Sequence, residues 1–168
     1  MLKIIYQFAI CIMLLIIVSC DGGQVDCGSR PELDLDQDQL DSEIAEIEAY
    51  LEANNIEYES DPSGIRYSVI ESGSGQSPNY CATVAIDYTG SELGSSEVFS
   101  SGIDTQVSLN SNSVVPGLKI AIANMNRNAD YKVYIPASLL NVKGVSQVLP
   151  PNLPIGENVE FRIRLTRY

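Results

Sequence analysis

The feature that most constrains the fold of this chain is a strict alternation of apolar and polar side chains over residues 159–166. Its apolar members are Val159, Phe161, Ile163 and Leu165, and its polar members are Glu160, Arg162, Arg164 and Thr166. Successive side chains of a β-strand point to opposite faces, so this pattern is that of a strand between a core and water. The chain must therefore build a sheet with one buried face and one wet face.

Three further segments have the composition of strands, and one has the pattern of a helix. Segments 65–71 and 83–88 are short and rich in β-branched and aromatic residues. Segment 131–135 alternates, with Tyr131, Val133 and Ile135 on one face and Lys132 and Tyr134 on the other. Segment 116–125 predicts a short helix with Pro116 in its first turn and a buried stripe of Leu118, Ile122 and Met125. The fold class that follows is α+β, an antiparallel sheet half-wrapped around one short helix.

The acidic charge of the chain is confined to one segment. The net charge is −12, yet residues 21–64 hold fourteen acidic residues against one basic residue, whereas residues 65–168 hold eight of each. The acidic stretch predicts a solvated, extended segment, with an acidic binding surface as the alternative. Because the chain has no basic patch, we expect no nucleic-acid partner.

The spacing of the apolar residues along the chain divides it into regions. Residues 20–37 predict an acidic flexible tether. Residues 38–63 predict an amphipathic helix and a linker, because Leu40, Ile44, Ile47 and Leu51 form one stripe that Asp38 or Asp41 would cap. The stripe packs either on the domain or on a second copy as a short coiled coil, and we expect a monomer. Turn residues at 61–64 mark the start of a domain that spans 64–168 and that we expect to fold alone.

The first 20 residues have the pattern of a secretory signal. Lys3 precedes an apolar run over 4–18, and small residues lead to Cys20. The segment looks like a bacterial lipoprotein signal peptide at 1–19, which implies a diacylated Cys20 as the mature N-terminus and as the membrane anchor. An uncleaved membrane helix is the alternative, but the run is shorter than the roughly 20 residues that span a bilayer.

Besides the expected lipid site Cys20, two cysteines follow the signal, Cys27 and Cys81. Disulfides persist in an oxidising cell envelope, and a bridge between these two would fix the tether to the start of the 83–88 strand. Two unpaired thiols are the alternative. Because these cysteines are isolated and the chain has no histidine, we do not expect a zinc site. We expect no other metal and no cofactor either.

Short motifs in a fixed order give the domain a family resemblance. They are VAIDYTG at 84–90, VFSSG at 98–102, VVPGL at 114–118, YIP at 134–136, LPPN at 149–152 and VEFRIRL at 159–165. Together they resemble the FKBP-type peptidyl-prolyl isomerases over 64–168, which is 105 of the 168 residues. The family's fold is of the α+β kind that the pattern predicts, so the resemblance and the pattern agree independently.

The resemblance implies an enzyme that needs neither a nucleophile nor a metal. Rotation about a peptide bond meets a barrier of about 18–20 kcal/mol, and X-Pro bonds exchange slowly enough to limit folding. The twisted amide is less polar than the planar one, so an apolar, water-poor pocket favours it. The expected clients are proline-containing segments of envelope or secreted proteins.

The family's pocket maps onto this sequence residue by residue. The resemblance implies that Tyr88 lines the pocket, that Phe99 forms its floor and that Phe161 is a buried aromatic residue beside them. It also implies that the backbone of Val114 and Val115 binds the ligand's carbonyl and amide groups. Leu149 matches an apolar residue of the loop over the site.

Three positions depart from the family's pattern. Ser100 stands where an acid is common, Leu118 where a tryptophan is usual and Asn141 where a tyrosine hydroxyl would be. Each lost hydrogen bond is worth about 1 kcal/mol, so catalysis one to two orders of magnitude weaker is expected if both polar groups act on the transition state. A binding or chaperone lipoprotein without useful turnover is the alternative function. The expected location is the outer membrane, facing the periplasm.

Overall fold

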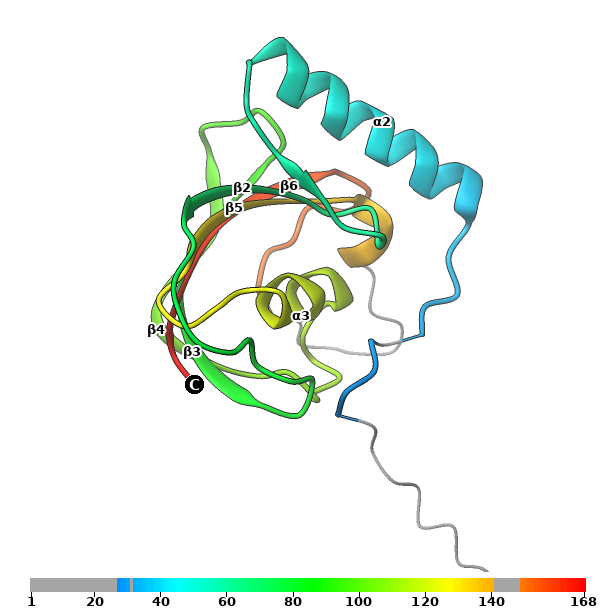
Figure 1. Cartoon of the computed structure of the whole chain (residues 1–168). Coiled ribbons are helices and arrows are strands. Elements are labelled where there is room, and N and C mark those ends of the chain that lie inside the picture. The colour runs from blue at the N-terminus through cyan, green and yellow to red at the C-terminus, as the bar shows by residue number, and fades with distance from the viewer. Residues whose placement is uncertain (1–26, 31, 141–148) are drawn as a thin grey trace, which may run out of the picture.

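The computed structural model describes residues 27–30, 32–140 and 149–168. The elements, in chain order, are α2 (Gln37–Ala53), β1 (Glu59–Ser60), β2 (Arg66–Glu71), β3 (Thr83–Glu92), β4 (Val98–Ser108), α3 (Pro116–Ala123), β5 (Asp130–Ile135), the 3₁₀ helix η1 (Ala137–Leu140) and β6 (Val159–Arg167). The described strands form one six-stranded antiparallel sheet in the order β1-β2-β5-β6-β3-β4. The sheet curves around α3, whereas α2 lies across the outer side of β2, β5 and β6 (Figure 1).

This arrangement confirms the predicted α+β class and the half-wrapped sheet. The four predicted strands correspond to β2, β3, β5 and β6, and the predicted helix corresponds to α3, which ends two residues early, at Ala123. The apolar face of β6 is fully buried: Val159, Phe161, Ile163 and Leu165 are each 0% exposed. They pack with α3 in the main core, as the alternation requires.

The amphipathic helix predicted within residues 38–63 is α2, but its cap differs from the prediction. Asp36, not Asp38 or Asp41, accepts a hydrogen bond from the Gln39 N–H at 3.2 Å. Asp36 has extended φ and ψ, as an N-cap residue must, so the helix begins at Gln37. The stripe packs on the domain and not on a second copy, because Ile47 and Leu51 are fully buried against the sheet side chain Tyr134.

The prediction of a wet outer face is wrong for β5. Tyr134 lies on that face and is 0% exposed, because α2 covers it. The Tyr134 and Tyr50 rings are 6.5 Å apart and tilted. Elsewhere the face is polar as expected: Lys132 pairs with Glu160 at 2.8 Å, and Arg162 pairs with Asp130 at 2.8 Å. α2 therefore forms a second, smaller core with the outer face of the sheet.

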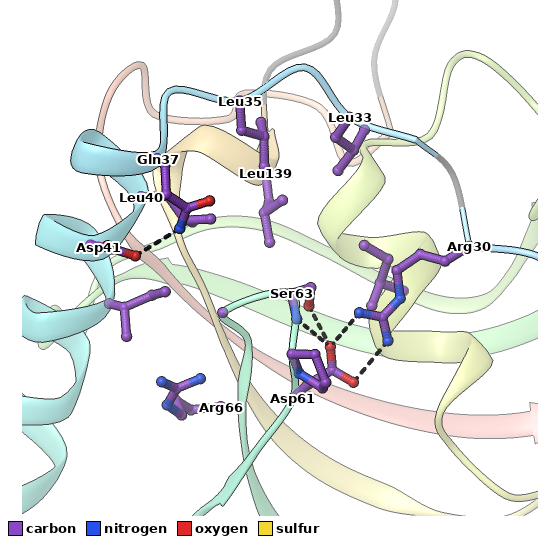
Figure 2. A pocket seen from close by; sticks show the side chains of 14 residues that line it. Arg30, Leu33, Leu35, Gln37, Leu40, Asp41, Asp61, Ser63, Arg66 and Leu139 are labelled. Carbon is purple, nitrogen blue, oxygen red and sulfur yellow. Dashed lines mark hydrogen bonds and ion pairs between the residues drawn. The ribbon is translucent and has the colours of Figure 1, made fainter.

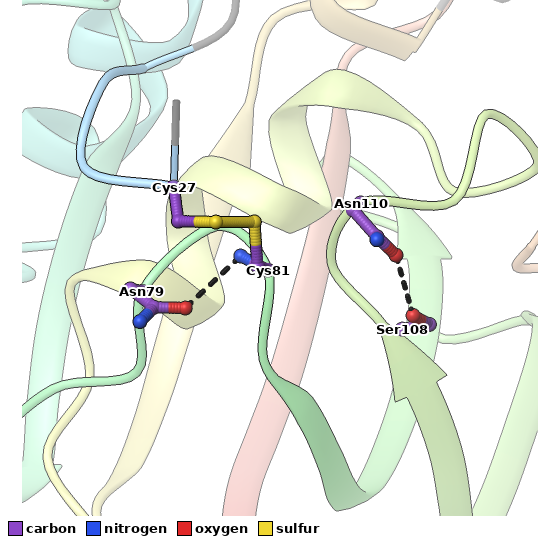
Figure 3. The surroundings of a disulfide bond; sticks show 5 residues. All are labelled: Cys27, Asn79, Cys81, Ser108 and Asn110. Atoms are coloured by element: carbon purple, nitrogen blue, oxygen red, sulfur yellow. Dashed lines mark hydrogen bonds between the residues drawn. A yellow bond between two sulfur atoms is a disulfide. The ribbon is translucent and has the colours of Figure 1, made fainter. Parts of the chain in front are cut away.

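The described part of the predicted tether, residues 27–30 and 32–36, is packed against the domain. A disulfide joins Cys27 to Cys81, with their Cα atoms 5.1 Å apart, just before β3 (Figure 3). Two leucines of the segment, Leu33 and Leu35, pack against the main core. The sequence pattern missed this because acidic residues alternate with these leucines, which gives the segment the average composition of a solvated linker.

A second contact fixes this N-terminal segment to the turn at 61–64. Arg30 pairs with Asp61 at 2.8 Å, and Asp61 also accepts hydrogen bonds from the Ser63 N–H and hydroxyl and from Asn124. Burial acts to raise the pKa of Asp61, but the hydrogen bonds from Ser63 and Arg30 outweigh it and hold that pKa below its usual value. The sheet itself starts before the predicted boundary at Gly64, since β1 pairs with β2.

The signal segment 1–19 and Cys20 lie outside the described residues. Among the residues that the structure does describe, no helix combines the length and the hydropathy needed to cross a membrane.

Candidate active site

Three aromatic side chains from neighbouring strands meet on the inner side of the sheet. Tyr88 comes from β3, Phe99 from β4 and Phe161 from β6. The Phe99 and Phe161 ring centroids are 5.7 Å apart in an edge-on arrangement, and those of Tyr88 and Phe161 are 6.3 Å apart and tilted. Tyr88 and Phe161 are buried, whereas Phe99 is only partly buried. Phe99 is therefore the member of the cluster that a ligand from solvent reaches first.

Two glycines make room for these rings. A Cβ on Gly90 would come within 2.9 Å of the Phe99 ring and would collide with the ring of Phe161. A Cβ on Gly102 would come within 2.7 Å of the Tyr88 ring. Gly90 lies opposite Phe161, and Gly102 lies opposite Tyr88, in the strand register. The glycines that end the YTG and VFSSG motifs thus give the aromatic rings their places over the sheet.

The tyrosine hydroxyl of this cluster has a neutral partner. The Tyr88 hydroxyl and the Ser100 hydroxyl are 3.2 Å apart, and both residues are buried. Ser100 was expected as a departure from an acidic residue, and the structure brings it to Tyr88. The pair satisfies two buried polar groups without placing a charge beside the aromatic rings, which keeps the site apolar.

The start of α3 supplies the aliphatic part of the site. Val114, Val115 and Leu118 are at most 4% exposed and belong to the same core as Phe161. Val115 is the N-cap residue of α3 in an extended conformation, and Pro116 follows as the first helical residue. Leu118 fills a core position at the point where the family usually has a tryptophan.

Leu149 meets this segment through its backbone. Its N–H donates to the Ser113 carbonyl at 2.7 Å, and its carbonyl accepts from the Val115 N–H at 3.2 Å. The two bonds form a parallel bridge between Leu149 and Val114. The Leu149–Pro150 peptide bond is cis. The Val115 N–H, expected to bind a ligand carbonyl, is thus engaged by the chain itself in this structure.

Most of the predicted site residues that the structure describes therefore belong to or pack against one core, and Ser100 is bonded to Tyr88 of that core. Tyr88, Ser100 and Phe99 lie on adjacent strands beside Phe161, and the α3 segment and Leu149 pack on the same core. Asn141 lies outside the described residues. Sequence reasoning missed Ser113, whose contribution is a backbone carbonyl and leaves no side-chain signal. The described residues contain no group of three His, Cys, Asp or Glu side chains that could hold a metal ion.

A separate cavity of about 390 Å³ lies on another side of the domain, between the N-terminal segment, α2 and η1 (Figure 2). Leu33, Leu40 and Leu139 line it together with the Arg30–Asp61 ion pair. None of the predicted site residues that the structure describes does so. The cavity is thus distinct from the aromatic cluster.

Comparison with known proteins identifies relatives of the domain. Residues 75–166 match the model of the FKBP-type peptidyl-prolyl cis-trans isomerase family. Over 110 residues the chain is 31% identical to the outer membrane protein MIP of Legionella longbeachae, which covers 62% of this chain and 44% of that protein. Over 100 residues it is 28% identical to the FKBP-type peptidyl-prolyl cis-trans isomerase FkpA of Escherichia coli K12, with 59% of this chain and 37% of FkpA covered. The chain thus spans less than half the length of these curated relatives.

Solved structures show the same fold. The crystal structure of a peptidyl-prolyl cis-trans isomerase from Pseudomonas syringae has a TM-score of 0.57 at 17% identity, and 80% of this chain and 97% of that chain are covered. The crystal structure of FkpA from Escherichia coli has a TM-score of 0.56 at 25% identity, with 77% and 62% covered.

Proposed function

We propose, since this chain belongs to the FKBP-type peptidyl-prolyl cis-trans isomerase family, that it catalyses the cis/trans exchange of X-Pro bonds in polypeptide clients. The observation that carries the proposal is the cluster of Tyr88, Phe99 and Phe161, which shares one core with the aliphatic start of α3. Such a cluster binds a proline ring and keeps water from the amide. No cofactor takes part in this reaction.

Each part of the site has a role in lowering the rotational barrier. Phe99 contacts the client's proline ring, because it is the partly exposed aromatic residue. The buried Tyr88–Ser100 pair and Leu118 line an environment without charge, where the twisted, less polar amide is favoured over the planar one. The Val115 N–H binds a client carbonyl once Leu149 releases it. Differential stabilisation of the twisted amide, and not tight binding of the client, then sets the rate.

A second candidate function is that of a binding module without turnover. The hydrogen bond from the Val115 N–H to the Leu149 carbonyl favours it, because it engages the donor expected to orient the client amide and leaves the aromatic cluster to bind the proline ring. Direct exchange measurements by NMR on several X-Pro peptides separate the two functions. Catalysis above background that a macrocyclic FKBP inhibitor abolishes supports the enzyme. Peptide binding without catalysis replaces the enzyme by the binding module, and neither binding nor catalysis overturns both.

We also propose that the protein is a lipid-anchored protein of the bacterial cell envelope, at the outer membrane and facing the periplasm. The lipoprotein-like signal before Cys20 supports this, as does the outer-membrane name of the Legionella relative. There it would act as a monomer on envelope or secreted clients. Cys20→Ala should leave an unprocessed precursor that no longer takes up a fatty-acid probe. Normal labelling of that variant would exclude Cys20 as the anchor.

A further inference from the structure

The N-terminal helix α2 reaches the short helix η1 through a group of polar contacts, which we call the η1 clamp. It consists of Glu43 and Glu46 of α2, Ala137 and Ser138 of η1, and Asn158. The Glu43 carboxylate accepts the Ser138 N–H at 2.8 Å and the Ser138 hydroxyl at 2.9 Å. The Asn158 side chain accepts the Ala137 N–H at 3.0 Å and donates to the Glu43 carbonyl at 3.2 Å and to the Glu46 carboxylate at 2.9 Å.

These contacts satisfy the first backbone N–H groups of η1. The N–H groups at the start of a helix lack partners within that helix, and a carboxylate there is also favoured by the helix dipole. Glu43 and Asn158 fill this role although they lie 95 and 21 residues from their η1 partners. Asn158 is only 5% exposed, so its hydrogen bonds are sheltered from water. The start of η1 is therefore held by α2 and Asn158, in addition to the local bond from the Leu139 N–H to the Pro136 carbonyl.

The other side of η1 packs against the start of α3. A Cβ on Gly117 would lie 3.2 Å from the Leu139 Cβ and 3.2 Å from the Leu139 carbonyl oxygen, and would collide with the Ile135 side chain. The first turn of α3 therefore rests directly on η1 and β5. That turn carries Val115 and Leu118, the aliphatic part of the candidate active site. A continuous series of contacts thus runs from Glu43 through η1 to the site.

The apolar docking of α2 is separate from this series. Ile47 and Leu51 bury against Tyr134 on the outer face of the sheet, one to two turns further along the helix than Glu43. Glu48 makes another polar contact, accepting from Arg66 of β2 at 2.8 Å. The helix therefore has one set of contacts that attaches it to the sheet and another that holds η1.

We propose that Glu43 is a positioning residue for the active site: it fixes η1 and, through Gly117, the first turn of α3. This inference rests on the proposed isomerase function. Its test uses the full chain, with Glu43→Ala, the conservative Glu43→Gln and the matched control Glu48→Ala. Glu48→Ala removes a polar contact from the same helix but leaves η1 untouched.

The expected result is a loss of activity that does not follow stability. Glu43→Ala should lower kcat/KM for an X-Pro peptide about tenfold, equivalent to about 1.4 kcal/mol. Glu48→Ala should keep its kcat/KM within twofold of wild type, although its melting temperature is similar to that of Glu43→Ala. Glu43→Gln should recover most of the loss, because its amide oxygen still accepts the Ser138 N–H. If Glu43→Ala does not fold, Ser138→Ala, which removes one of the two hydrogen bonds from the η1 side, takes its place with an expected loss of about threefold.

Hydrogen exchange gives a readout that is independent of catalysis. The Lys119 N–H donates to the Val115 carbonyl and reports on the first turn of α3. Its exchange should accelerate at least fivefold in Glu43→Ala and remain unchanged in Glu48→Ala. If wild type does not catalyse exchange, the isomerase function fails and positioning is judged on the Lys119 amide alone. Equal activity losses in Glu43→Ala and Glu48→Ala, or an unchanged Lys119 amide in Glu43→Ala, would overturn the inference.

Discussion

Phe99→Ala separates a role of this side chain in catalysis from a role in packing. The ring meets Phe161 edge-on at 5.7 Å, and such a pair is worth about 0.5–1.5 kcal/mol beyond its burial. Fully buried phenylalanines cost about 3–5 kcal/mol when replaced by alanine. Because Phe99 is only partly buried, we expect a loss of about 2 kcal/mol in the free energy of unfolding. In a chain of this size that lowers the melting temperature by about 4–8 °C, so the variant remains folded at 15 °C.

The effect on activity should be larger than this stability loss implies. At 15 °C nearly all of the variant is folded, so a lower kcat/KM reports the site and not unfolding. We expect kcat/KM for an X-Pro peptide to fall at least tenfold, because the proline ring loses its aromatic contact and water reaches the amide; the transition state then loses about 1.4 kcal/mol or more.

The control for Phe99→Ala is Ile103→Ala. Ile103 lies on the same strand and is 87% exposed, so its truncation should change neither stability nor activity measurably. NMR exchange spectroscopy measures the rates without a coupling protease. The reasoning fails if Phe99→Ala melts lower than wild type but keeps its kcat/KM within twofold. In that case the ring packs the sheet and does not contact the client.

Three further changes test the N-terminal half. Replacing Cys27 and Cys81 by serine opens a link across 54 residues and should lower the free energy of unfolding by up to about 4 kcal/mol, measured by urea titration with reduced wild type as the control. The depressed pKa of Asp61 stabilises the fold above the unfolded value of 3.8, and this stability is lost as pH falls through the lower folded pKa. Asp61→Asn should therefore be less stable than wild type at pH 7. Its melting temperature should also change less than that of wild type below pH 4. A fragment of residues 64–168 should melt well below one of residues 27–168, because it lacks α2 and β1 and exposes Tyr134; equal melting temperatures would show that α2 adds no stability.

Patterns that depend on neighbours in sequence were enough to predict most of the sheet. β6 has a period of two because one face meets the core along its whole length. β4 was not predicted as a strand, and the structure shows why. Its register shifts relative to β3, and Asp104 has a φ of +50°, which places Ile103 in solvent and breaks the alternation. A strand with such a bulge carries no regular apolar pattern to detect.

The N-terminal half was harder to predict because its contacts are distant in sequence. The stripe of α2 was visible, but the sequence left open whether a second copy or the domain covers it. Tyr134 answers this question. Its position on the outer face predicts an exposed residue, but α2 covers it and it is buried. Among the described residues its hydroxyl has no hydrogen-bond partner, and burial is the main cause that raises its pKa, so at this position the contact with α2 is apolar.

Contacts between residues that are distant in sequence also limit how much of the catalytic site can be predicted from the sequence. The motifs predict that Val115 and Leu149 belong to the site, but only the structure shows that their backbones bond to each other. A client carbonyl that takes the Val115 N–H exchanges one neutral hydrogen bond for another, and such bonds differ by about 1 kcal/mol or less. The cost of opening the site then lies in moving the partly buried Leu149 side chain from the core. Whether a client's proline ring on Phe99 offsets that cost decides between an isomerase and a closed binding module, although both use the same residues.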